Sequence, residues 1–293
     1  MNYNTVTKNI RKKLKEYIEE NDIKALVIGV SGGIDSAVCC ALAKPVCDEL
    51  GIPLIGRSIP IESNKQDEIN RADMVGGSFC TNYYSFNLNE EYKFILKDMI
   101  VDKNDIDTKI RKGNVKARLR MIYLYDIAQE NRGMVLSTDN YTEYLLGFWT
   151  LHGDVGDYGM IQNLWKTEVY ELAEDLWYTS PTLNQQHALH ACIKAVPTDG
   201  LGITDSDLDQ LGAKDYGEAD RILKIALTND MDSFIWDDHL KYDGRPEDYN
   251  EFARERSMLI NIDKNPVILR MKNSAYKRNN PFNLSRSVLF GEE

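Results

Sequence analysis

The feature of this chain that most constrains its fold is an apolar run that breaks abruptly into glycine. The run Ala25–Ile28 leads directly into a loop, and a helical pattern continues from about Ser36 to Ala43. A strand, a glycine-rich turn and a helix in this order form the first unit of a parallel α/β sheet. The loop that joins them, called the phosphate loop below, consists of Gly29, Val30, Ser31, Gly32, Gly33, Ile34, Asp35 and Ser36.

The composition of this loop predicts that it binds a pyrophosphate group. Its glycines let the backbone turn sharply and bring N–H groups close to an anion. The two serines add hydroxyl donors, and the following helix points its positive end at the phosphates. Asp35 would repel phosphates unless a Mg²⁺ ion lay between them. The loop therefore predicts ATP with magnesium, and a reaction at the α-phosphate from which pyrophosphate leaves.

Two commoner nucleotide motifs are absent from the sequence. Without Gly-x-x-x-x-Gly-Lys-Ser/Thr, a kinase or GTPase loses its main support. Without Gly-x-Gly-x-x-Gly, a dinucleotide-cofactor domain is disfavoured. An ordinary glycine-rich turn between strand and helix remains the structural alternative.

The rest of the chain alternates between strand and helix patterns. Strands are predicted at 25–30, 53–59, 83–86 and 134–137, and helices at 6–20, 36–50, 66–76, 115–129 and 166–177. This alternation predicts a Rossmann-like, three-layer α/β/α fold with a parallel sheet, in which ligands bind at the carboxyl ends of the strands. The following stretches are predicted as a loop-rich region over 178–215, with a lid over 196–215, a helix over 246–259 and a basic tail over 272–278.

Composition places the chain among globular proteins. Of its 293 residues, 43% are hydrophobic and 28% charged, and the net charge of −11 argues against a general nucleic-acid binder. No apolar run approaches the roughly 20 residues that span a bilayer, and the polar N-terminus lacks a signal-peptide core. The five cysteines show no metal-site spacing, which favours reduced thiols. We expect a cytoplasmic protein that binds neither nucleic acid nor membranes.

Several further motifs follow the phosphate loop along the chain. They are 113–121 (Gly-Asn-Val-Lys-Ala-Arg-Leu-Arg-Met), 137–140 (Ser-Thr-Asp-Asn) with Glu143, 147–150 (Gly-Phe-Trp-Thr), 153–154 (Gly-Asp) with Asp157, 164–167 (Leu-Trp-Lys-Thr), 196–201 (Val-Pro-Thr-Asp-Gly-Leu) and 209–212 (Asp-Gln-Leu-Gly). Over roughly residues 5–280, this series resembles the NAD synthetase family, specifically its ammonia-dependent form.

The resemblance implies a reaction and a fold. The nicotinate carboxylate of deamido-NAD attacks the α-phosphate of ATP, pyrophosphate leaves, and ammonia converts the acyl-adenylate to NAD and AMP. It implies an adenine nucleotide alpha-hydrolase-like fold and a single domain over 1–293, with a helix at 5–20, an ATP pyrophosphatase core at about 22–180, and a lid and C-terminal helical region at about 181–293. About 24 residues precede the first strand, too few for a fused glutaminase, so we expect free ammonia as the donor.

The resemblance also assigns roles to individual residues. The phosphate loop would hold the ATP phosphates, with Asp35 and Lys166 catalytic. Asp35 and Glu143 would bind Mg²⁺. Further ATP contacts are expected from Lys166, Thr138 and Thr198, and deamido-NAD contacts from Arg118, Asp157 and Lys277. Arg57, after the second strand, is a further candidate for ATP.

Two positions depart from the family pattern. Leu151 stands where family members often have lysine, and Tyr276 where they often have histidine. Both family positions touch deamido-NAD, so the ATP half of the site matches better than the acceptor half.

Structural roles remain as alternatives for these side chains. Glu143 and the threonines suit helix starts or turns, and Lys166 and Arg118 could be a surface lysine and an ion-pair partner. The family forms homodimers, and we expect the helix 115–129, with Val115, Leu119, Ile122 and Leu124, at the interface. Competing functions are another adenylating ligase with a changed acceptor, such as xanthosine monophosphate or tRNA, and a non-catalytic ATP-binding module.

Overall fold

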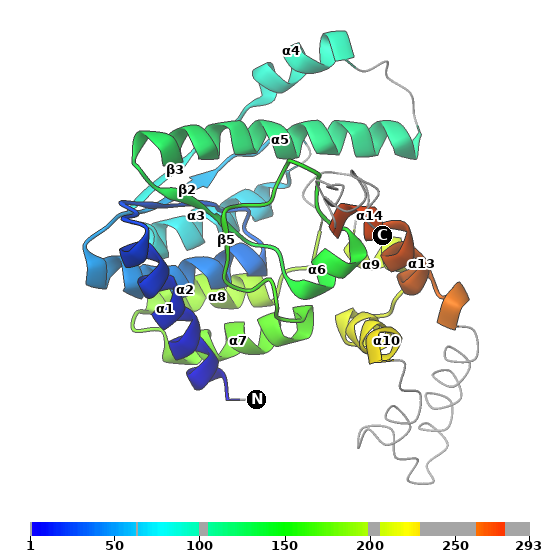
Figure 1. The fold of residues 1–293 in the computed structure, drawn as a ribbon. Coiled ribbons are helices and arrows are strands. Elements are labelled where there is room, and N and C mark those ends of the chain that lie inside the picture. Colours follow the sequence, from blue (N-terminus) through cyan, green and yellow to red (C-terminus); the bar gives the residue numbers. More distant parts are fainter. Residues whose placement is uncertain (1, 63, 100–104, 199–205, 229–261, 279–293) are drawn as a thin grey trace, which may run out of the picture.

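The computed structural model describes residues 2–62, 64–99, 105–198, 206–228 and 262–278. At its centre lies one sheet whose strands are all parallel, in the order β3-β2-β1-β4-β5 (Figure 1). The strands are β1 (Leu26–Gly29), β2 (Leu54–Ser58), β3 (Asn82–Ser85), β4 (Met134–Ser137) and β5 (Tyr158–Gly159). Chain order reverses direction beside β1, which places the phosphate loop where such sheets bind ligands.

Helices follow the strands along the chain and cover both faces of the sheet. They are α1 (Tyr3–Glu20), α2 (Ile34–Leu50), α3 (Gln66–Phe79), α4 (Asn89–Met99), α5 (Ile106–Glu130), α6 (Tyr141–Leu146), α7 (Lys166–Thr179), α8 (Leu183–Ile193), α9 (Asp207–Leu211), α10 (Tyr216–Thr228), the 3-10 turn η2 (Ile262–Lys264), α13 (Pro266–Asn273) and α14 (Ala275–Arg278).

The strand side chains separate into two apolar layers. Leu26 and Ile28 belong to a core shared with α1, α2, α3, α7 and α8. Val27 and Val135 belong to a second core shared with α4 and α5. Successive strand residues point to opposite faces, so one continuous apolar run serves both layers. Figure 1 shows α5 on one side of the sheet and α2, α7 and α8 on the other, which confirms the predicted three-layer fold.

A third apolar cluster lies at the C-terminal side of the sheet. Leu146 of α6, Leu223 of α10 and Val267 of α13 are each buried in it. This cluster fixes the C-terminal helices beside α6, whose first turn carries Glu143.

The structure corrects one prediction and extends others. Residues 178–215 are not loop-rich throughout, because α8 occupies Leu183–Ile193. Thr182 caps this helix, and Ala188, Leu189 and Cys192 bury one face of it. Glutamine and histidine fill the intervening positions, so the apolar periodicity in the sequence is weak. The two-residue β5 and the whole of α4 were not predicted, and α5 begins well before residue 115.

The predictions for the cysteines and for membrane helices can also be compared with the structure. All five cysteines are free thiols, as predicted. In the part of the chain that the structure describes, we find no helix with the length and apolarity needed to cross a bilayer. The predicted helix over 246–259 and residues 199–205 of the predicted lid lie outside the described residues.

Candidate active site

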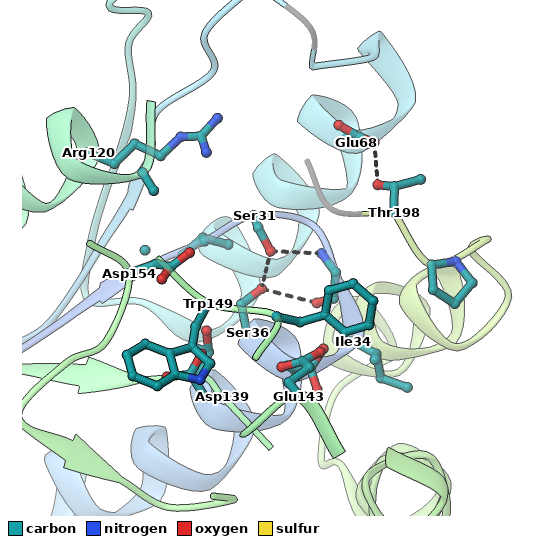
Figure 2. A pocket seen from close by; sticks show the side chains of 18 of the residues that line it. Ser31, Ile34, Ser36, Glu68, Arg120, Asp139, Glu143, Trp149, Asp154 and Thr198 are labelled. Carbon is teal, nitrogen blue, oxygen red and sulfur yellow. Dashed lines mark hydrogen bonds between the residues drawn. The ribbon is translucent and has the colours of Figure 1, made fainter. Parts of the chain in front are cut away.

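The phosphate loop is held in shape by its own hydroxyl groups. Ser31 Oγ accepts a hydrogen bond of 3.2 Å from the N–H of Gly33, and Ser36 Oγ donates one of 3.0 Å to the Gly33 carbonyl. The two serine oxygens lie 3.1 Å apart (Figure 2). Because Gly33 also precedes the first residue of α2, the loop presents the start of that helix to the cavity.

Gly32 is the turn residue of the loop. Its φ is +80°, and a Cβ atom there would lie 2.3 Å from the carbonyl oxygen of Glu68. Its own carbonyl accepts a hydrogen bond of 3.0 Å from Arg71 Nε, so this peptide packs against α3. The loop residues that line the adjoining cavity are Gly29, Val30, Ser31, Gly33, Ile34, Asp35 and Ser36.

Lys166 is clamped between the two predicted metal ligands. Its Nζ lies 2.5 Å from Asp35 Oδ2 and 2.9 Å from Glu143 Oε1. The Lys166 side chain is 4% exposed and each carboxylate 17%. Asn140 caps α6 through the Glu143 N–H and donates a hydrogen bond of 2.9 Å to Asp35 Oδ1. The starts of α2, α6 and α7 thus bring together three residues that are distant in sequence.

Burial shapes the protonation of this cluster. Burial raises the pKa of Asp139 to about 7, with Asp154 adding to the rise, and burial also raises the pKa of Glu143. For Lys166, burial alone would lower the pKa, but the facing carboxylates of Asp35 and Glu143 raise it well above its ordinary value. The carboxylates of Asp35 and Glu143 face the ammonium of Lys166, and Asp139 lines the same cavity. Burial disfavours the charged forms of these carboxyl groups, and a further cation bound beside them would favour the ionised forms.

The cavity beside the loop has a volume of about 480 Å³ and includes the other predicted ATP contacts in its wall. Thr138 follows β4, and Thr198 donates a hydrogen bond of 2.9 Å to Glu68 Oε1 (Figure 2). Arg57 Nη1 donates hydrogen bonds to the Gly56 carbonyl and to Asn82 Oδ1 at the end of β2. These residues converge on one edge of the sheet, as expected for a nucleotide site.

Arg120 and Asp154 are among the cavity residues that the sequence reasoning missed. Arg120 donates hydrogen bonds of 2.9 Å to the Ile59 carbonyl and to Asn64 Oδ1, and Asp154 lines the same cavity (Figure 2). Arg120 follows Arg118 by two positions in the same motif, and this spacing within a helix places the two side chains in different directions. The motif itself was the available signal for both arginines.

A second cavity, of about 770 Å³, adjoins the first and contains two of the predicted acceptor contacts. Arg118 donates a hydrogen bond of 3.0 Å to the Leu151 carbonyl, and Lys277 Nζ donates one of 2.7 Å to the Gly147 carbonyl. The residues that line both cavities are Met121, Asp139, Trp149 and Lys277. This shared wall is where a ligand in one cavity can meet a ligand in the other.

Asp157 does not line either described cavity, in contrast to the expectation that it contacts the acceptor. Its carboxylate accepts hydrogen bonds of 2.9 Å from the Tyr125 hydroxyl and from the N–H of Val135. Through these hydrogen bonds the Asp157 side chain connects α5 to β4. Asp154, three positions earlier, is the carboxylate of this loop that lines the first cavity.

Comparison with known proteins identifies the family. A family model described as NAD synthase matches residues 6–281. The chain belongs to the NAD synthase family. An NH(3)-dependent NAD(+) synthetase from Finegoldia magna is 35% identical over 210 residues, covering 71% of this chain and 84% of that protein. One from Mycoplasma genitalium is 35% identical over 208 residues, covering 69% and 80%.

Solved structures share the NAD synthase fold of this chain. An NH3-dependent NAD synthetase from Campylobacter jejuni has a TM-score of 0.68 at 22% identity, covering 97% of this chain and 100% of that one. A Francisella tularensis protein described as an NMN synthetase has a TM-score of 0.70 at 22% identity, covering 97% and 98%. These likenesses confirm the predicted fold, and the family match confirms the predicted enzyme class.

Proposed function

We propose that this chain converts deamido-NAD to NAD with ATP and free ammonia, through an acyl-adenylate, releasing AMP and pyrophosphate. The observation that carries this proposal is the clamp of Lys166 between Asp35 and Glu143, directly beside the phosphate loop. A protein that only binds ATP needs no buried lysine and carboxylates at the point where pyrophosphate would depart. Positioned charge of this kind stabilises a leaving group as negative charge develops on it.

The phosphate loop and Lys166 would act on the ATP phosphates. The loop N–H groups and the start of α2 would bind the phosphate oxygens, with Ser31 and Ser36 as further donors. Lys166 is a compact cation on a flexible stem, suited to following charge as it moves onto pyrophosphate. Thr138, Thr198 and Arg57 would hold the nucleotide in the first cavity.

The residues of the cluster fit a Mg²⁺ ion. Asp35 and Glu143 offer carboxylate oxygens, the ligand type that Mg²⁺ prefers, and they lie 2.5 and 2.9 Å from the single ammonium of Lys166. Within the described ranges, no three His, Cys, Asp or Glu side chains form a complete metal site. Phosphate oxygens and water would therefore supply the remaining ligands, as is usual for Mg²⁺ with nucleotides. When bound, the ion would neutralise charge on the departing pyrophosphate.

The second cavity would hold the acceptor. Arg118 and Lys277 line it, and the shared wall at Trp149 and Asp139 leads to the phosphate loop. The acceptor's carboxylate would reach the α-phosphate across this wall. Excluding water there protects the acyl-adenylate from hydrolysis before ammonia arrives.

A second candidate product is NMN, made by the same amidation of a mononucleotide. The Francisella tularensis structure carries that description. The observation that favours it here is Leu151 in the second cavity, where family members often have a lysine that touches deamido-NAD. Without the positive charge of that lysine, the second cavity offers one contact fewer to deamido-NAD, the larger of the two acceptors.

We also propose a homodimer built on the outer face of α4 and α5. Leu119 and Leu124 are buried in the chain's own core, which removes them from the expected interface. Ile122 and Phe94 are 63% and 75% exposed, and both line an open groove between these helices. Large exposed apolar side chains gathered on one face are typical of subunit interfaces.

The experiment that tests the function measures products directly. Purified protein is incubated with ATP, Mg²⁺ and ammonium, and with either deamido-NAD or nicotinate mononucleotide. Equal amounts of NAD and AMP, lost in Asp35→Ala, would support the proposal. NMN with the mononucleotide and no NAD with deamido-NAD would favour the second candidate. ATP binding without either product would contradict both.

A further inference from the structure

The helix that carries Lys166 has no N-cap side chain to accept its first N–H groups, although Glu168 of its first turn accepts a hydrogen bond of 2.9 Å from the Trp165 N–H. Trp165 occupies its N-cap position and has no side-chain oxygen to accept the N–H groups of the first turn. Unpaired N–H groups at a buried helix start lower the stability of the fold. A lysine near the positive end of the helix dipole lowers it further, because the two charges repel each other. Some other part of the chain must satisfy these groups.

Two other helices supply the acceptors. The Lys166 N–H donates to Thr142 Oγ1 of α6 over 2.9 Å. The Thr167 N–H donates to Asp220 Oδ2 of α10 over 2.9 Å. Asp220 is 1% exposed, so its carboxylate is a buried negative charge at the positive end of α7.

Asp220 also forms a hydrogen bond with α6. Its Oδ1 accepts a hydrogen bond of 2.5 Å from the hydroxyl of Thr142, which is itself fully buried. Thr142 precedes Glu143, and Thr167 follows Lys166. One carboxylate therefore joins the immediate neighbours of both members of the Lys166–Glu143 pair.

The same face of α10 makes two more contacts at this point. The ring of Tyr216 lies 5.3 Å from Lys166 Nζ, and Lys224 Nζ lies 5.1 Å from the ring of Trp165. Residues 216, 220 and 224 are four apart, so they form one stripe along the helix. All three residues of this stripe contact residues at the start of α7.

We propose that Asp220 is a positioning residue for the active site: it caps the Lys166 helix from α10 and, through Thr142, sets Lys166 and Glu143 in register. The role rests on the proposed functions of Lys166 and Glu143. The carboxylate touches neither ligand nor reacting atom; it acts on the backbone that aims two side chains which do. A displacement of catalytic groups by about 1 Å lowers the reaction rate even when the protein stays folded.

Four variants test this proposal. Thr142→Val keeps the shape of the side chain and removes its oxygen, whereas Thr142→Ser keeps the oxygen. Asp220→Asn keeps the size of the side chain but removes its negative charge and leaves one acceptor oxygen for two donors. Ile18→Ala, in the α1 core away from the site, is the control for a general loss of stability. All are compared with wild type well below their melting temperatures.

Two measurements are made on each variant: kcat and KM for NAD formation, and the affinity for Mg·ATP by calorimetry. We expect Thr142→Val and Asp220→Asn to lose about ten- to a hundredfold in kcat and at least about threefold in Mg·ATP affinity. Thr142→Ser should stay within about threefold of wild type in both. Ile18→Ala should melt earlier with unchanged kcat.

The outcomes separate this proposal from the proposed function. If Thr142→Val and Asp220→Asn melt earlier but keep wild-type kcat and Mg·ATP affinity, the role is merely structural and the inference is overturned. If wild type makes no NAD, the proposed function fails, and the Mg·ATP affinities still decide the inference. If Asp220→Asn does not fold, the Thr142→Val and Thr142→Ser pair decides it.

Discussion

The hydroxyl of Thr198 donates a hydrogen bond of 2.9 Å to Oε1 of Glu68, which lies 130 positions earlier in the chain. Glu68 is 6% exposed, and its other oxygen accepts hydrogen bonds from the Asn64 amide and the Lys65 N–H. Both Thr198 and Glu68 line the first cavity. The segment after α8 is therefore fastened to α3 at the wall of the nucleotide site.

Replacing Thr198 tests this fastening. Thr198→Val should raise KM for ATP about fivefold with little change in kcat, because it removes one hydrogen bond to a charged group. Thr198→Ser retains the hydroxyl and should behave like wild type. Steady-state kinetics with ATP as the varied substrate provide the measurement. An unchanged KM in Thr198→Val would show that the contact does not matter for nucleotide binding.

Gly32→Ala should damage the phosphate loop. The substitution meets both a left-handed backbone and a Cβ position 2.3 Å from the Glu68 carbonyl oxygen, so we expect Mg·ATP binding to fall below detection. Gly77→Ala is the matched control, because nothing lies within 4 Å of its Cβ position and α3 continues through it. That control should be neutral or stabilising by up to about 1 kcal/mol. Calorimetric titration with Mg·ATP and thermal melting distinguish the two, and normal ATP binding by Gly32→Ala would refute the prediction.

Lys166→Met should remove activity and lower stability. The change leaves two largely buried carboxylates facing each other, and breaking a buried ion pair costs about 3–5 kcal/mol of unfolding free energy. We expect kcat to fall at least about a hundredfold. Lys44→Met breaks only a surface pair with Asp48 and should cost no more than about 0.5 kcal/mol. Urea unfolding and NAD formation are measured for both, and equal stability losses would contradict the prediction.

Stability without magnesium should depend on Asp139. Burial raises the pKa of this carboxyl from 3.8 to about 7, so folding favours its protonated form. Its contribution is complete below the unfolded pKa, near 4, and is lost as the pH rises through about 7. The unfolding free energy in EDTA should therefore decline over this range. The decline should be shallower in Asp139→Asn, whose amide stays neutral.

Urea denaturation in EDTA at stepped pH supplies the data for that comparison. Asp48→Asn, a change at an exposed carboxylate, serves as the control and should keep the wild-type slope. Identical slopes for wild type and Asp139→Asn would show that Asp139 does not titrate in this window.

A charged residue on α5 should separate the proposed subunits. Ile122→Lys replaces an exposed apolar side chain of the groove between α4 and α5 by an ammonium, which pairing with a second copy would have to bury. We expect wild type to be a dimer and Ile122→Lys a monomer by light scattering at micromolar concentration. Lys93→Gln, beside the same groove, should leave the dimer intact. A monomeric wild type would contradict the proposal.

Sequence reasoning succeeded where one local pattern determines one local structure. The run Ala25–Ile28 and the glycines after it predicted β1, the loop and α2, because a buried strand and a tight turn each have a distinctive composition. It failed for α8, whose helical face is defined by the helices around it rather than by a clear period of apolar residues.

The site followed the same division. Asp35, Glu143 and Lys166 were named from motifs, and the places of Asp35 and Glu143 after predicted strand ends made the convergence of those two predictable. The use of Asp157 by Tyr125 and Val135 was not predictable, since it depends on how α5 packs against β4. Asp220 carried no motif signal; its importance appears only when α10 is seen against α7.

The contacts of Lys166 have a consequence for how the proposed Mg²⁺ ion would bind. With its ammonium between Asp35 and Glu143, the chain carries an internal counter-ion that lets two carboxylates lie close together. Binding of the proposed Mg²⁺ ion would then be an exchange of cations rather than an addition of one. A divalent ion that took over the two carboxylates would free the Lys166 ammonium to turn toward the phosphates of the nucleotide. The position of Lys166 would thereby depend on binding of the metal-bound nucleotide.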